Sequence, residues 1–267
     1  MKLKKYLALT RAGLIESLQY RLAMFVMVIG NLLYLTLVYF LWKSVYASAG
    51  TDTVNGMTFS DTLIYLVLAT ALFNFMEMYT VWEIGRNIQS GKIVLDLLRP
   101  MSYRRYLFWS YSGTFVTQFF ATFLPTFVIV TALTHGAVPL GINLFWFVVS
   151  AALSVTINFS IDFIVGTVCL YTESIWGINI MKQVIVLLLS GAVIPLAFFP
   201  DTLRKIVDIL PFQAIYNAPL TILLKDSPSL SDVLPVIGVQ LAWALTMTAA
   251  GCLFWKRSLR QITVNGG

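Results

Sequence analysis

The sequence predicts an all-α integral membrane protein, and its composition and charge pattern lead to this fold class. Hydrophobic residues make up 58% of the 267 positions and charged residues only 11%, whereas a soluble domain carries about 25% charged residues. The apolar residues are gathered into long stretches, and most of the Lys and Arg residues lie between these stretches. We therefore expect one transmembrane domain over residues 1–267.

The long apolar stretches predict the membrane-spanning helices, because a helix needs about 20 apolar residues to cross a bilayer. Six stretches meet this condition: residues 22–42, 61–82, 106–133, 143–170, 182–199 and 233–255. The first contains no charged residue, and each of its Leu, Ile, Val and Phe residues favours insertion by about 0.3–0.6 kcal/mol.

The charged residues between the spans predict the orientation. With an even number of crossings, both termini lie on one side of the membrane. Of the 18 Lys and Arg residues, only Lys43, Arg204, Lys205 and Lys225 fall on the other side. Lys and Arg are in excess in cytoplasmic loops, so we expect both termini in the cytoplasm. This distribution also accounts for the net charge of +6, and we do not expect nucleic acid as a partner.

Residues 1–20 mix charges with apolar residues at helical spacing, including Leu3, Leu7, Leu14 and Leu18. This pattern predicts an amphipathic helix lying along the inner leaflet, with its lysines near anionic headgroups. A disordered basic tail is the alternative.

The stretch GRNIQSGKIVLDLLRP, at residues 85–100, superficially resembles a phosphate-binding loop. That loop needs four residues between its first Gly and its Gly-Lys pair, followed by Ser or Thr. Here five residues separate Gly85 from Gly91, and Ile93 stands where the hydroxyl is required. We therefore expect no nucleotide site in this segment.

Residues 84–100 instead predict a short amphipathic helix in the longest cytoplasmic loop. Apolar residues recur on one helical face, with polar residues away from it: Ile84, Ile88, Leu95 and Leu98, with Gly91 in line, against Arg86, Gln89, Lys92 and Asp96. Such a helix either rests on the membrane or inserts into a groove of a soluble partner.

Residues 200–231, on the outside, are too broken to span the membrane and too apolar for an ordinary loop. Pro211 and Pro219 divide them into short pieces, and we expect short re-entrant helices dipping into the outer leaflet. Just before them, the fifth span ends in SGAVIPLAFFP, which contains Pro195, Phe198 and Phe199. Pro and Gly at membrane depth indicate a site buried in protein or lining a cavity, and Pro195, Phe198 and Phe199 are therefore candidates for translocation or gating.

Two carboxylates lie within predicted spans, Glu77 in the second and Asp162 in the fourth. Intramembrane carboxylates are candidates for function, here translocation or gating. Polarity used only for helix packing is the alternative. With a single histidine and no catalytic motif, the chain is expected to have no catalytic residues, no metal site and no cofactor of its own.

Two segments resemble the type-2 permeases of ATP-binding-cassette (ABC) exporters, namely IQSGKIVLDLLRPMSYRRYLF at 88–108 and GAVIPLAFFPDTLRKIVDILPF at 191–212. The first is similar to the coupling segment of that family and the second to the block that ends its fifth helix. The likeness is to a branch of uncharacterised bacterial permeases, which implies a bacterial cell membrane.

The resemblance implies a non-enzymatic permease subunit of an ATP-driven exporter. Its partners would be an ABC ATPase subunit that carries ATP and Mg²⁺, a second permease chain of the same or a homologous kind, and the lipid bilayer. The coupling residues would be Arg86, Ile88, Gly91, Lys92, Leu95 and Leu98. The second and fifth helices would line the pathway, and the segment after the fifth would close its outer end. The substrate is not identified, and the resemblance implies lipophilic or drug-like compounds as candidates.

Two other functions stay open at this stage. An ion-coupled secondary transporter would use Glu77 and Asp162, but such folds usually carry paired repeats with matched broken helices, and only the fifth span looks broken. A non-catalytic membrane assembly subunit is the second alternative.

Overall fold

The computed structural model describes residues 2–19, 21–77, 79–134, 136–172 and 175–261, and it is an all-α membrane protein. The N-terminal half contains α1 (Lys2–Gln19), α2 (Arg21–Ala49), β1 (Thr53–Val54), β2 (Met57–Thr58), α3 (Phe59–Met76), α4 (Thr80–Gln89), α5 (Ile93–Leu97), α6 (Tyr103–Gln118), a π-helix (Phe119–Phe123) and α7 (Leu124–Leu133). The C-terminal half contains α8 (Ile142–Val168), α9 (Ile175–Leu189), a 3₁₀ turn (Leu196–Phe198), α10 (Asp201–Ile209), α11 (Asn217–Leu224), α12 (Leu230–Ser258) and a second 3₁₀ turn (Leu259–Gln261).

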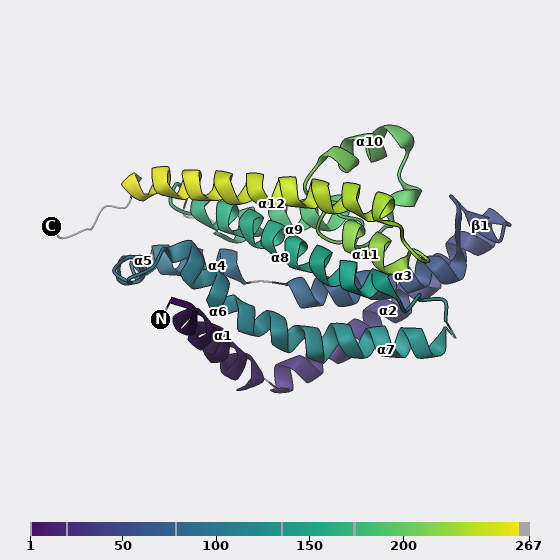
Figure 1. Ribbon diagram of the computed structural model, residues 1–267, viewed down its shortest axis with the longest axis horizontal. Coiled ribbons are helices and arrows are strands. Elements are labelled where there is room, and N and C mark those ends of the chain that lie inside the picture. The colour runs from purple at the N-terminus through teal and green to yellow at the C-terminus, as the bar shows by residue number, and fades with distance from the viewer. Residues whose placement is uncertain (1, 20, 78, 135, 173–174, 262–267) are drawn as a thin grey trace.

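The helices form one elongated bundle, with α8 and α12 packed along each other (Figure 1). α5 and both chain ends lie at one end of the bundle, and the β1–β2 hairpin lies at the other (Figure 1). Among the described residues, five segments are long and apolar enough to cross a membrane, and Ile175–Leu189 is a shorter apolar helix. A count of six spans therefore stays a prediction.

The second predicted span, 61–82, is not one uninterrupted helix. α3 ends at Met76, α4 begins at Thr80, and Glu77 between them has extended backbone angles (φ −64°, ψ 126°). The amide Nδ2 of Asn158 in α8 donates to the Met76 carbonyl at 2.9 Å. This bond satisfies one of the carbonyls that a helix end leaves free.

The third predicted span, 106–133, contains a π-helical turn between α6 and α7. Pro125 follows this turn in the first turn of α7. Proline has no N–H to donate to the preceding turn, and here the Leu124 N–H bonds the Phe119 carbonyl five residues back. The sequence analysis missed this local change of helical register.

The fifth predicted span, 182–199, was placed too far along the chain. The helix runs from Ile175 to Leu189, so Lys182 lies in its interior and not at its start. It stops before Gly191, whose φ of +79° is strained for any residue with a side chain. The rest of the predicted span is a turn followed by the short 3₁₀ segment.

Residues 200–231, which were predicted to lie outside, contain two short helices, but only one of the two prolines separates them. Their entry into the outer leaflet stays a prediction. Pro211 lies between α10 and α11, whereas Pro219 lies in the first turn of α11, where proline is tolerated. In α10, Val207 is buried while Ile206 and Ile209 are exposed. The β1–β2 hairpin, which was not predicted, turns at Asn55–Gly56 with positive φ at both residues.

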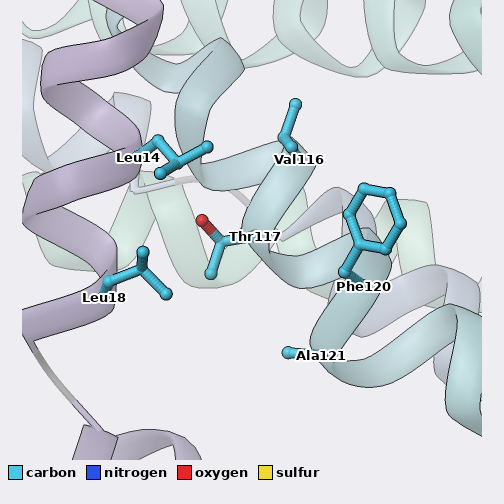
Figure 2. A pocket seen from close by; sticks show the side chains of 6 residues that line it. All are labelled: Leu14, Leu18, Val116, Thr117, Phe120 and Ala121. Atoms are coloured by element: carbon cyan, nitrogen blue, oxygen red, sulfur yellow. The ribbon is translucent and has the colours of Figure 1, made fainter.

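α1 covers the predicted amphipathic segment except residues 1 and 20, which lie outside the described residues, and it packs against α6. Gly13 and Gly113 face each other so closely that neither position has room for a side chain. The hydroxyls of Ser17 and Thr117 are hydrogen-bonded at 2.6 Å. Next to this contact between α1 and α6 lies an open apolar pocket of about 300 Å³. It is lined by Leu14, Leu18, Val116, Thr117, Phe120 and Ala121 (Figure 2).

Candidate functional site

The segment predicted to couple to a partner folds as two short helices, α4 and α5, joined by a turn at Gly91. Gly91 has φ +73°, and an added Cβ would meet nothing within 4 Å. The single helical face predicted for 84–100 is therefore wrong, because this turn reverses which residues face inward. Ile84 is fully buried, whereas Leu95 and Leu98 are 66% and 77% exposed.

A buried polar network holds α5 under α4. The Asn87 amide Nδ2 donates to Asp96 Oδ2 at 3.2 Å and to the Tyr103 hydroxyl at 3.4 Å. The Arg99 Nε donates to the other Asp96 oxygen at 3.0 Å, and its guanidinium lies over the Tyr106 ring, 4.1 Å from the centroid. Asp96 is thus turned into the protein, and the sequence analysis wrongly counted it on the outer polar face.

The predicted coupling residues end up in two environments. Ile88 is half-buried against the core. Arg86, Lys92, Leu95 and Leu98 are exposed, so cationic and apolar side chains share the surface around α5. Leu97, which was not predicted, is exposed as well. We call Lys92, Leu95, Leu97 and Leu98 the α5 tip.

α4 is seated closely on α8 and α9. A Cβ on Gly85 would come within 2.5 Å of the Ile175 side chain, and one on Gly166 would come within 2.6 Å of Ile84. Small residues allow such close helix approach in membrane proteins. The Ile84–Gly166 and Gly85–Ile175 contacts therefore fix α4 to α8 and α9, and the sequence analysis did not identify them.

Asp162 in α8 has a partner that the sequence analysis did not assign. Lys182 Nζ in α9 donates to Asp162 Oδ1 at 2.8 Å. The two side chains are only 1% and 12% exposed. Asp162 Oδ2 is buried without a hydrogen-bond partner among the described residues. Position 182 was predicted only as the start of the fifth span, so the pairing of Lys182 with Asp162 was not predicted.

Glu77 stands at the α3–α4 junction, where its side chain is half-buried. The described residues include no ion pair or hydrogen bond to its carboxylate. The structure brings Asp162 and Lys182 together, and it places Glu77 beside the helix end that Asn158 binds. A translocation or gating role for Glu77 and Asp162 stays a prediction.

The predicted gating residues Pro195, Phe198 and Phe199 lie in the turn after α9, which contacts α2 and α3. Pro195 is buried, Phe199 is half-buried, and the Phe198 ring packs edge-on to Trp42 with centroids 4.6 Å apart. Tyr65 in α3 donates its hydroxyl to the Gly191 carbonyl at 3.0 Å. This bond ties the end of α9 to α3.

Among the described residues, no group of three or more His, Cys, Asp or Glu side chains is placed to hold a metal ion. The arrangement offers instead a surface for a partner, the α5 tip, and a charge pair inside the bundle.

The family model described as ABC-2 family transporter protein matches residues 32–266, a range that includes the candidate residues described above. No curated protein matches the chain.

Proposed function

The chain belongs to the ABC-2 family of transporter proteins, and from this premise we propose that it is the membrane-spanning subunit of an ATP-driven exporter. Membership makes the chain a multi-pass membrane permease component of an ABC transporter. The proposal adds that a separate ATPase chain supplies the energy, with ATP and Mg²⁺ bound there, and that the α5 tip receives this partner.

The α5 tip is the observation that carries the proposal. Leu95 and Leu97 are exposed on the five-residue helix α5, and Leu98 is exposed directly after it. The Asp96 network fixes that helix to α4 and α6. A helix that binds in a groove of a partner needs exposed apolar side chains, a fixed position on its own protein and charged residues around the apolar contact. Arg86, Lys92 and Arg99 supply positive charge around it.

The orientation and the assembly belong to the same proposal. α5 and both chain ends share one end of the bundle (Figure 1), and an excess of Lys and Arg there supports a cytoplasmic location in a bacterial cell membrane. Most apolar side chains of α2 are exposed. This surface suits lipid and a second permease chain, identical or homologous.

The test is co-purification of the chain with candidate ABC ATPases expressed together with it. Leu95→Asp should abolish both complex formation and stimulation of ATP hydrolysis, because a charge in an apolar groove is not compensated. Leu140→Asp is the matched control, since Leu140 is 65% exposed in the loop between α7 and α8.

If both variants co-purify equally with the ATPase, the α5 tip is not part of the interface. Transport by the purified chain alone, driven by an ion gradient, would reject the ATP-driven scheme in favour of an ion-coupled transporter using Glu77 and Asp162. Undiminished export by partner chains in cells lacking this protein would favour an assembly subunit.

A further inference from the structure

Arg104 is a half-buried cation where α6 meets α8 and α12, and it forms no ion pair with a described residue. It is the second residue of α6, at the end of the bundle that carries α5. Arg104 takes part in none of the ion pairs among the described residues, which involve Arg99, Lys182 and Lys225. A charge withdrawn from water without an opposite charge is costly, so this position calls for an anion.

Two neutral hydroxyls fix the Arg104 side chain. Its Nη2 donates to Ser160 Oγ in α8 at 2.9 Å and to Thr248 Oγ1 in α12 at 3.0 Å. Ser160 donates its own proton to the Thr156 carbonyl at 2.7 Å, which leaves its oxygen free to accept. The guanidinium also lies 5.4 Å from the centroid of the Phe159 ring. Its direction is therefore set by three helices.

The rest of the guanidinium is left available. Arginine has five N–H donors, and both hydrogens of Nη2 are used. Nε is buried without an acceptor, and Nη1 donates no hydrogen bond to a described residue. Because the side chain as a whole is only half-buried, an anion at the surface can reach it.

The surroundings indicate the depth at which this anion lies. On α12, Leu241 and Leu245, which precede Thr248, are 48% and 63% exposed. Lys256, which follows Thr248, is exposed near the end of that helix. An apolar face beneath a cationic rim fits a phospholipid.

We propose that Arg104, oriented by Ser160 and Thr248, binds the phosphate of an anionic phospholipid where α6, α8 and α12 meet. The phosphate oxygens accept hydrogen bonds from Nη1, and the phosphate neutralises the charge of the guanidinium. The acyl chains lie against the exposed apolar face of α12. Lys256 adds attraction for an anionic headgroup over a zwitterionic one.

The full-length chain, purified in mild detergent, is titrated with phosphatidylglycerol and separately with phosphatidylcholine. Native mass spectrometry counts the retained lipid, and the unfolding midpoint reports stabilisation. We expect phosphatidylglycerol to bind more tightly, and Arg104→Gln to weaken its binding about tenfold or more by removing a charge-assisted contact. Arg105→Gln is the matched control, since Arg105 is the exposed neighbour that bonds only Ser102.

Other variants cover the case in which Arg104→Gln fails to accumulate. Thr248→Val keeps the charge and removes one orienting hydroxyl, so we expect weaker phosphatidylglycerol binding with unchanged phosphatidylcholine binding. Arg104→Lys keeps a charge without the planar fork and should retain part of the preference.

The proposal is wrong if Arg104→Gln, or Thr248→Val in its place, keeps the wild-type preference for phosphatidylglycerol. Stabilisation by inorganic phosphate that matches the lipid effect would assign the site to a soluble anion. Loss of ATPase binding in Arg104→Gln with unchanged lipid binding would assign Arg104 to a protein interface. Each of these results leaves the test of the α5 tip unaffected.

Discussion

Removing Lys182 or Asp162 alone should destabilise the protein far more than replacing both together. The pair is joined at 2.8 Å and almost fully enclosed, with Asp162 only 1% exposed. Removing one partner of such a pair costs about 3–5 kcal/mol, because the other charge stays buried. We expect the lower end for Lys182→Met, about 3 kcal/mol, since Asp162 can be neutralised by taking up a proton.

The double variant Asp162→Leu/Lys182→Met removes both charges but keeps the side-chain volume, so it distinguishes the effect of the ion pair from the effect of packing. Replacing both charges by apolar residues of similar volume is often neutral or stabilising, so we expect its stability within about 1 kcal/mol of the wild type. The free energy of unfolding is measured by SDS titration in mixed micelles for the wild type, both single variants and the double variant.

Single variants that cost less than about 1 kcal/mol would refute this reasoning, since no buried charge would then have been left alone. Transport assays on the same four proteins decide the role of the pair. A stable double variant that transports normally makes the pair a packing feature, whereas a stable one without transport makes it part of the transport mechanism. Asp162→Asn should likewise lower transport more than stability if the carboxylate is functional.

Two further substitutions test the seating of α4 and α5. Gly91→Pro should uncouple ATP hydrolysis from transport, because proline cannot adopt φ +73° and cannot donate the Gly91 N–H to the Ile88 carbonyl at 3.1 Å; normal coupling ratios in proteoliposomes would contradict this. Gly166→Ala should lower the unfolding midpoint, with a net loss of about 1 kcal/mol from overpacking against Ile84. Gly251→Ala, where the nearest neighbour is an ordinary 3.4 Å away, should be neutral or stabilising, and an equal response of the two glycines would argue against close α4–α8 packing.

Composition and apolar runs were enough to predict the all-α membrane fold, because insertion depends on hydrophobicity summed along a segment. Helix interruptions were harder to predict. The break at Glu77 carries no Pro or Gly, and it is stabilised by Asn158, which lies 82 residues away. The hairpin at Asn55–Gly56, in contrast, carries the strongest local turn signal available, and closer attention to that dipeptide would have found it.

The candidate site was predictable only where position along the chain decides exposure. Arg86, Lys92, Leu95 and Leu98 lie in a polar loop and are exposed. Which of these side chains face the protein interior depends on the turn at Gly91. The spacing of apolar residues along the sequence does not reveal that turn. The sequence also shows Asp162 and Lys182 as separate charges, because their meeting depends on how α9 lies against α8.

The junction at Glu77 divides the segment Phe59–Gln89 between two mechanical units. α3 is tied to the far end of the bundle through Tyr65, while α4 is fitted against α8 and α9 through glycines. We therefore expect that a displacement of α5 is not transmitted along one continuous helix to the opposite face of the bundle. It would be transmitted to α8 and α9, the two helices joined by the Asp162–Lys182 ion pair.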